Sequence, residues 1–414
     1  MARKGRQRRR AFIPAYESYY IPPFQDFCEL LRVPTGPIEL VNALSRLTGL
    51  EPKVGRSTVA KLTTVGVSEK SFGLLSNYFK AAAPGVDFSP GFVRKVLIYK
   101  GLRSNYASWC GPIEGVKQSL SQERCSRLYP MISFVEERAR HQRGMRLKLV
   151  ALRKLAKQGM EGQAVEGVRS LEAELYRKYT LVPSSVIDSA VSILSLSIPS
   201  SEFSVEKKEV LARYCLYQYW DFYLSALALF EALSKYSYQG EEGLLTTPTA
   251  FMRVLGKIVS SDCRSPRNVF EALLDDWRSH FSKGRRHMTW ADLAKGIQLD
   301  PETTVAGTTL KERQKKQLRD WRLGKSYPSE EKLKQFLLHQ PSGPTDLIDL
   351  MVFHGVIARA LDRLINVSIQ GQKISGVSKE LSWAILREIF ANYSRHYHKA
   401  LEFAPYLEWK KAGS

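Results

Sequence analysis

The sequence predicts an all-α fold built from several helical domains. Apolar residues recur at spacings of three and four over most of the chain, which is the period of an amphipathic helix. The alternation of apolar and polar residues that is typical of a strand is almost absent, and no internal repeat is visible. A chain of 414 residues is too long for a single core, so we expect more than one domain.

We divide the chain where its composition changes and where proline or glycine interrupts a helical pattern. The expected segments are a flexible basic arm at 1–22, an N-terminal helical domain at 23–130, a central domain of long helices with an aromatic core at 131–283, a basic segment at 284–340 and a C-terminal helical pair at 341–414. The C-terminal helices, which begin near Thr345 and Ser378, are expected to form a bundle or a homodimer surface.

The N-terminal arm contains six lysines or arginines in its first ten residues. It has too little apolar surface to order itself, so we expect a flexible segment whose side chains contact phosphates or enter a groove. The candidate phosphate contacts are Arg6, Arg8, Arg9 and Arg10. A solubilising tail or a localisation signal is the alternative interpretation.

Short helices are expected in the N-terminal domain. One runs from Pro37 toward Gly49, one opens at Ser68 and stops before Pro84, and one begins near Ser89. Residues 44–75 also allow a second helix-turn-helix, with a short helix from about Ser57, although any compact helical domain contains helices joined by short turns.

Residues 131–179 are predicted to form one or two long helices. A packing stripe repeats at intervals of four, three and four through Met145, Leu149, Leu152 and Ala156. Another face carries the candidate phosphate contacts Arg143, Arg146, Arg153 and Lys157, and no acidic residue occurs between Glu137 and Glu161. This face is either a polyanion-binding surface or an exposed face whose acids come from a neighbouring segment.

The most apolar stretch is residues 210–233, where aromatic side chains nearly surround the predicted helix. We expect it in the middle of a bundle rather than as a platform for stacked bases. A membrane span is not expected, because Gln218, Asp221 and Glu231 interrupt the stretch.

The charge balance indicates a polyanionic partner. The chain has 62 Lys and Arg against 41 Asp and Glu, a net charge of +21, and a pI near 9.7. Such a surplus attracts nucleic acid first. Five scattered cysteines without a C-x-x-C pair favour a reducing compartment, and the N-terminus lacks the apolar region of a secretory signal, so we expect a cytoplasmic protein, associated with the nucleoid if the source is bacterial.

The basic segment is centred on residues 311–329. Leu310, Leu318 and Trp321 are expected to face inward on one helix. Its cations are expected to point outward, and they are Lys311, Arg313, Lys315, Lys316, Arg319 and Arg322. Gly324 is suited to end this helix, and Pro328 and Ser329 to begin the next one.

The pattern Trp321-x-x-Gly324-x-x-x-Pro328-Ser329-x-x-x-Leu333-x-x-Phe336 resembles the end of the recognition helix and the start of the following helix in Cro and lambda-repressor type helix-turn-helix domains. Residues 289–294 resemble the start of their first helices. The residues between them, 300–310, depart from the family because they are too many for its tight turn. The resemblance covers residues 288–338 only and implies binding to duplex DNA.

We therefore assign roles to the polar side chains of this segment. Candidate base contacts are Arg313, Gln314, Gln317 and Arg319. Candidate phosphate contacts are Lys311, Lys315, Lys316, Arg322 and Lys325. Trp321, Gly324, Pro328 and Ser329 are expected to support the motif.

No catalytic constellation, cofactor motif or metal-ligand spacing is found in the sequence. The prediction is a multi-domain, sequence-preferring protein that binds double-stranded DNA, of a regulatory, mobile-element, phage-related, replication or partition type, acting as a homodimer or within a larger nucleoprotein complex. The alternatives are an RNA or single-strand binder, an interaction subunit of a nucleoprotein complex and, less well supported, a nuclease or recombinase.

Overall fold

The structure is a computed structural model, and the regular elements of the residues that it describes are all helices. It describes residues 20–31, 37–62, 65–82, 108–110, 113, 122–194, 203–246, 248–262, 267–282, 287–299, 308–340, 345–374 and 376–402. Within these ranges no residue lies in a strand, which confirms the all-α fold class.

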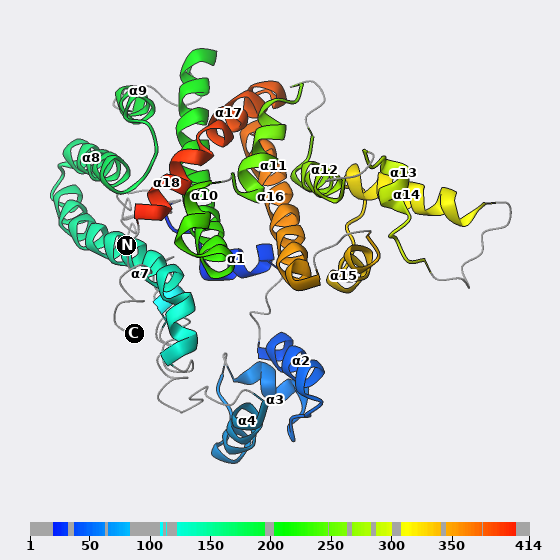
Figure 1. Ribbon diagram of the computed structural model, residues 1–414. Helices are drawn as coiled ribbons and strands as arrows, with labels where there is room; N and C mark the ends of the chain where they lie inside the picture. The colour runs from blue at the N-terminus through cyan, green and yellow to red at the C-terminus, as the bar shows by residue number, and fades with distance from the viewer. Residues whose placement is uncertain are drawn as a thin grey trace, which may run out of the picture. The chain divides into compact units, whose positions relative to one another are not determined.

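The chain divides into two compact units, and their helices are labelled in Figure 1. Unit 1 comprises Met1–Phe230 and Ala400–Ser414, and unit 2 comprises Glu231–Lys399. The helices up to the boundary are α1 (Phe24–Leu31), α2 (Pro37–Thr48), α3 (Arg56–Lys61), α4 (Glu69–Ala82), α7 (Gln122–Lys157), α8 (Glu161–Tyr179), α9 (Ser184–Leu194) and α10 (Val205–Thr246), within which the boundary lies.

The helices that follow are α11 (Ala250–Val259), α12 (Val269–Phe281), α13 (Trp290–Ala294), α14 (Leu310–Arg322), α15 (Glu330–Leu338), the 3-10 turn η2 (Thr345–Leu347), α16 (Ile348–Ile374), α17 (Lys379–Ala391) and α18 (Tyr393–Glu402). In unit 2, α16 packs against α12, α15 and α17, and α11 packs against α12 and α17. The side chains of Phe251, Phe270, Leu273 and Leu386 are fully buried between them.

These units differ from the segments expected from composition. The expected boundary at 130 falls inside α7, and the one at 283 separates α12 from α14, although these two helices pack together. The boundary at 340 likewise separates α15 from α16, which are in contact. Composition identifies loops, whereas a domain boundary depends on which helices share a core.

The end of the expected basic arm belongs to the folded part of unit 1. Tyr20 and Ile21 are 1% and 0% exposed, and Arg138 donates a hydrogen bond to the Tyr20 carbonyl oxygen at 2.9 Å. The expectation of a flexible arm up to residue 22 is therefore wrong at its end, because Tyr20 and Ile21 supply apolar surface that the core buries. Residues 1–19, with Arg6, Arg8, Arg9 and Arg10, lie outside the described residues.

The expected helices of the N-terminal half are mostly confirmed. The helix from Pro37 ends at Thr48 with Gly49 in the left-handed region at φ +71°, and α4 spans Glu69–Ala82. The helix expected from Ser89 lies outside the described residues. The long-helix stripe is also confirmed, since Met145, Leu149 and Ala156 are buried.

The aromatic stretch is buried, as expected. Tyr217, Trp220, Phe222 and Tyr223 on α10 are each less than a tenth exposed, which removes their faces from contact with a base. In unit 2 the expected C-terminal stripe on α17 and α18 is buried as well, at Trp383, Leu386, Phe390, Tyr393 and Tyr397.

A buried ion pair in unit 1 gives a test of this packing. Arg138 and Asp221 lie 2.6 Å apart with side chains 6% and 1% exposed. We expect Asp221→Ala to lower the free energy of unfolding by about 3–5 kcal/mol, because it leaves a buried guanidinium unpaired. The control is Asp188→Ala, since Asp188 pairs with Arg177 at the surface and its loss should cost less than about 1 kcal/mol in urea denaturation. Equal losses for both variants would contradict this account.

Candidate nucleic-acid interface

Each helix of the basic segment begins at a side-chain cap. The hydroxyl groups of Thr289, Thr309 and Ser329 accept hydrogen bonds from backbone N–H groups in the first turns of α13, α14 and α15. In α13 and α14 the acid three residues later, Asp292 or Glu312, accepts a hydrogen bond from the backbone of the cap, which completes a capping box. These short local interactions set the start of each helix.

The chain turns between α14 and α15 at Gly324. This residue has φ +65°, and a Cβ atom added to it would lie 3.2 Å from the Tyr327 hydroxyl oxygen. The Lys325 N–H donates to the Asp320 carbonyl oxygen at 3.0 Å and closes the last turn of α14. The expected glycine stop and the serine cap at Ser329 are confirmed, and Pro328 is buried.

Aromatic packing connects the two helices across this corner. The rings of Trp321 and Phe336 meet edge to face, with centroids 5.5 Å apart and planes at 83°. Trp321 is 1% and Leu318 is 2% exposed, so both face inward as expected. Leu310 is 57% exposed, and its expected inward position is wrong, because it is the first residue of α14, about two turns before the buried Leu318.

Two glutamine side chains hold α13 in place. Gln314 on α14 donates to the carbonyl oxygens of Lys295 and Ile297 at 3.3 and 2.9 Å. Buried Gln340, after α15, donates to the Leu293 carbonyl oxygen at 3.1 Å. The carboxamide of Gln314 therefore satisfies the end of α13, which corrects its expected role as a base contact.

Arg322 is also a structural residue rather than an outward-facing phosphate contact. Its Nη2 and Nε donate to Glu271 Oε1 on α12 at 2.7 and 3.1 Å, and its guanidinium lies 3.9 Å from the centroid of the Trp290 ring. Charge pairing and stacking both direct it toward the chain. The expectation that it contacts DNA is corrected for this reason.

Asn268, just before α12, connects that helix with the basic segment, a contact that the sequence does not predict. The Asn268 side chain accepts from the Glu271 N–H at 2.6 Å and so caps α12, while its Nδ2 donates to the Arg322 carbonyl oxygen at 2.5 Å. One side chain thus satisfies the start of α12 and the end of α14. The Asn-x-x-Glu spacing before the apolar run of α12 is a helix-start signal that the sequence shows. The contact of Asn268 with Arg322 cannot be predicted from this spacing.

A buried carboxyl group on α16 also contacts the start of α12 and the turn after α14. Asp362 accepts hydrogen bonds from the backbone N–H groups of Val269 and Phe270 at 2.6 and 3.1 Å and from the Tyr327 hydroxyl at 3.0 Å. Burial raises the pKa of Asp362 to about 7, against the effect of these hydrogen bonds. Asp362 therefore connects α16, the start of α12 and the corner after α14.

Most of the cations predicted as DNA contacts stay at the surface of this segment. Lys311, Lys315, Lys316, Arg319 and Lys325 are exposed, and Arg313 and Gln317 are partly exposed. On α14, Lys316 and Arg319 lie opposite the buried Leu318 and Trp321, whereas Lys311 and Lys315 lie nearer the packed side. The α14 helix carries six cations against the two carboxylates Glu312 and Asp320, and Glu312 is engaged by its cap. This arrangement presents a cationic surface that we call the α14 face.

The basic residues expected on α7 belong to unit 1. Arg143, Arg153 and Lys157 are exposed there, and the side chain of Arg146 lies outside the described residues. Nearby Lys148 lies 3.8 Å from Glu174 of α8, so α8 supplies an acid to part of this surface.

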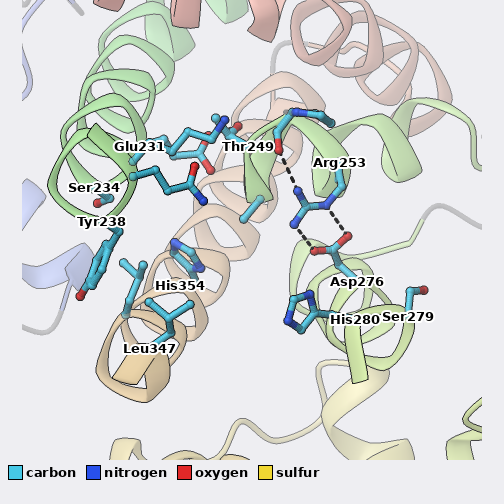
Figure 2. A pocket seen from close by; sticks show the side chains of 15 residues that line it. Glu231, Ser234, Tyr238, Thr249, Arg253, Asp276, Ser279, His280, Leu347 and His354 are labelled. Atoms are coloured by element: carbon cyan, nitrogen blue, oxygen red, sulfur yellow. Dashed lines mark hydrogen bonds and ion pairs between the residues drawn. The ribbon is translucent and has the colours of Figure 1, made fainter. Parts of the chain in front are cut away.

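Unit 2 also contains a pocket of about 580 Å³ (Figure 2). Its walls come from α10, α11, α12 and α16, with Glu231, Arg253, Asp276 and His354 among the side chains that line it. Burial lowers the pKa of His354 to about 4, which leaves its imidazole neutral at pH 7.

The charged groups of this pocket are engaged within the chain. Arg253 donates to both carboxylate oxygens of Asp276, at 2.9 and 2.8 Å. Glu231 accepts from the Thr249 and Tyr393 hydroxyls and from the Phe251 N–H, and burial raises the pKa of its carboxyl. We interpret the pocket as a structural polar network. In the part of the chain described, no group of three or more His, Cys, Asp or Glu side chains is placed to hold a metal ion.

No family model matches this chain, and no curated protein and no solved structure shows a significant match to it. Among the described helices, none has both the length and the apolar character needed to cross a bilayer.

The buried Asp362 predicts a pH dependence of stability. Because its folded pKa is raised from 3.8 to about 7, the native state binds one proton more than the unfolded state between these values. Its contribution to the free energy of unfolding is full below the lower value, falls as the pH rises and is lost above the upper one. We expect Asp362→Asn to remove the decrease in the free energy of unfolding that Asp362 causes as the pH rises, as measured by urea denaturation at several pH values.

Asp349→Asn is the matched control, because the Asp349 side chain is 86% exposed. It should leave the pH dependence of the wild-type protein almost unchanged. If Asp362→Asn shows the same pH dependence as this control, the carboxyl does not titrate as described.

Proposed function

We propose that this protein binds double-stranded DNA with a sequence preference, through the α14 face of unit 2. The observation that carries the proposal is that α14 is fixed by contacts along one side and still keeps most of its cations exposed. Gln314, Leu318, Trp321 and Arg322 are held by the chain, while Lys311, Lys315, Lys316 and Arg319 are exposed. A helix fixed in this way can present its cations to a duplex without first becoming ordered.

The length of α14 and the side chains of the α14 face suit the major groove and the phosphate backbone of DNA. At 13 residues, α14 is about 20 Å long, which suits the major groove. Lys311, Lys315, Lys316 and Lys325 are proposed as phosphate contacts that set the register. Arg319 is proposed to contact guanine, and Gln317 adenine, because these side chains offer paired hydrogen-bonding atoms for those bases.

The resemblance to Cro and lambda-repressor domains supports the same proposal. The glycine turn at Gly324, the Ser329 cap and the buried pair of Trp321 and Phe336 occupy the positions that the resemblance rests on. Residues 300–307, which depart from that family, lie outside the described residues. Arg313 is retained as a base-contact candidate, whereas Gln314 and Arg322 are not.

The salt dependence of binding tests the phosphate contacts. We expect the double variant Lys315→Ala, Lys316→Ala to reduce the slope of log affinity against log salt by about 2, because each neutralised phosphate releases counterions. Its thermal stability should stay near that of the wild-type protein, since both side chains are exposed. Fluorescence anisotropy with a labelled duplex measures the slope.

Arg322→Ala is the matched control, since it removes one charge from the same helix but from the side that packs against Glu271. It should lower the thermal stability and leave the salt slope of the folded protein unchanged. A slope that falls for Arg322→Ala but not for the double variant would overturn the assignment.

A competition gel shift separates duplex DNA from the other nucleic acids. We expect unlabelled duplex DNA to displace a labelled duplex at a lower concentration than RNA or single-stranded DNA of equal length, because the roles proposed for Arg319 and Gln317 require base edges in a wide major groove. Stronger displacement by RNA would favour an RNA-binding function instead. Selection from random duplexes should then yield a preferred sequence that Arg319→Ala relaxes.

A further inference from the structure

Helices α2, α3 and α4 share a small core of their own in unit 1. The buried members are Val41, Val59, Leu62, Leu75, Tyr78, Phe79 and Ala82, with Ile38, Leu44, Val54, Val67 and Phe72 packed around them. The Tyr78 hydroxyl donates to the Val41 carbonyl oxygen at 3.1 Å and contacts the Ser45 hydroxyl at 2.9 Å, which joins α4 to α2. Three helices are therefore held in one arrangement.

The connection between α3 and α4 is a glycine turn followed by a serine cap. Gly66 has φ +84°, and its N–H donates to the Lys61 carbonyl oxygen at 2.8 Å. The Ser68 hydroxyl then accepts from the Ser71 N–H at 3.3 Å at the start of α4. A short helix, a turn with a left-handed glycine and a second helix on a common core form a helix-turn-helix arrangement.

One side of α4 faces solvent along its whole length. Lys70, Gly73, Asn77 and Lys80 follow one another at spacings of three, four and three, so they lie on one side of the helix, and all four are exposed. The opposite side carries Leu75, Tyr78, Phe79 and Ala82 into the core. We call the exposed side the α4 stripe.

Gly73 sits in the middle of this stripe, and the described residues give no packing reason for a glycine there. A Cβ atom added there would have no described atom within 4 Å, and the φ angle of Gly73 is not positive. Glycine inside a helix is destabilising compared with alanine. The absence of a side chain here leaves the backbone of α4 open to close approach from solvent.

We propose that the α4 stripe binds a second segment of duplex DNA, with Gly73 allowing close approach, Asn77 contacting a base edge and Lys70 and Lys80 contacting phosphates. An exposed asparagine can pair with adenine, and lysines attract the backbone. Residues 37–82, which form α2, α3 and α4, carry six exposed cations against three acids. The cations are Arg46, Lys53, Arg56, Lys61, Lys70 and Lys80, and the acids are Glu39, Glu51 and Glu69. The α4 stripe is separate from the α14 face and shares only the ligand class with the proposed function.

Gly73→Ala tests the close approach in the full chain. The variant should unfold at the same or a higher temperature, because alanine favours the helix. Its dissociation constant for a labelled duplex of mixed sequence should rise roughly tenfold, because the methyl group enters the contact. Unchanged affinity in a folded Gly73→Ala protein would overturn the role of Gly73. Asn77→Ala should relax the sequence preference, and an unchanged preference would overturn the base contact proposed for Asn77.

A charge-matched pair of double variants tests the stripe as a whole. The double variant Lys70→Ala, Lys80→Ala should reduce the salt slope by about 2. The double variant Arg46→Ala, Lys53→Ala removes the same charge from α2 and the loop after it, away from the stripe, and should reduce the slope less. Equal reductions would mean diffuse attraction and would overturn the proposal.

The α14 double variant, measured alongside, separates the two proposals. If only the α14 variant weakens binding, the α4 stripe is excluded and the proposed function stands. If only the α4 variants weaken binding, the stripe stands and the α14 face is excluded. If both double variants weaken DNA binding and their effects add when combined, both proposals are supported.

Discussion

The arrangement of the basic segment depends on the buried carboxyl group of Asp362. This one side chain, on α16, accepts hydrogen bonds from the first two residues of α12 and from Tyr327 in the turn after α14. Through α12 it sets the position of Asn268 and Glu271, which contact the last residue of α14, Arg322. The C-terminal end of α14 is thus held by interactions that begin at a helix outside the motif.

The side chains of α14 have different tasks. Its packed side uses a glutamine, a leucine, a tryptophan and an arginine for contacts within the chain, and Gln314 and Arg322 satisfy carbonyl oxygens and a carboxylate there. Lys311, Lys315, Lys316 and Arg319 of the same helix stay in solvent. A cationic surface held by a rigid interior loses little conformational entropy on binding, which favours recognition of a regular polyanion.

Periodicity and capping rules predicted the helices well, because those features are local. The stop at Gly324, the cap at Ser329 and the inward Trp321 all depend on neighbours within a few residues. The roles of Gln314 and Arg322 could not be predicted in the same way, since their partners lie 17 to 51 residues away in the chain. The domain boundaries differed for the same reason, because contacts between distant helices define the units.

The central claim is that the lysines of the α14 face contact duplex DNA, and lysine footprinting tests it most directly. Acetylation rates of Lys311, Lys315, Lys316 and Lys325 would be measured by mass spectrometry with and without a saturating duplex. The account predicts slower acetylation of these four residues in the complex and an unchanged rate at exposed Lys379 of α17. Unchanged rates at all four α14-face lysines under saturation would contradict it.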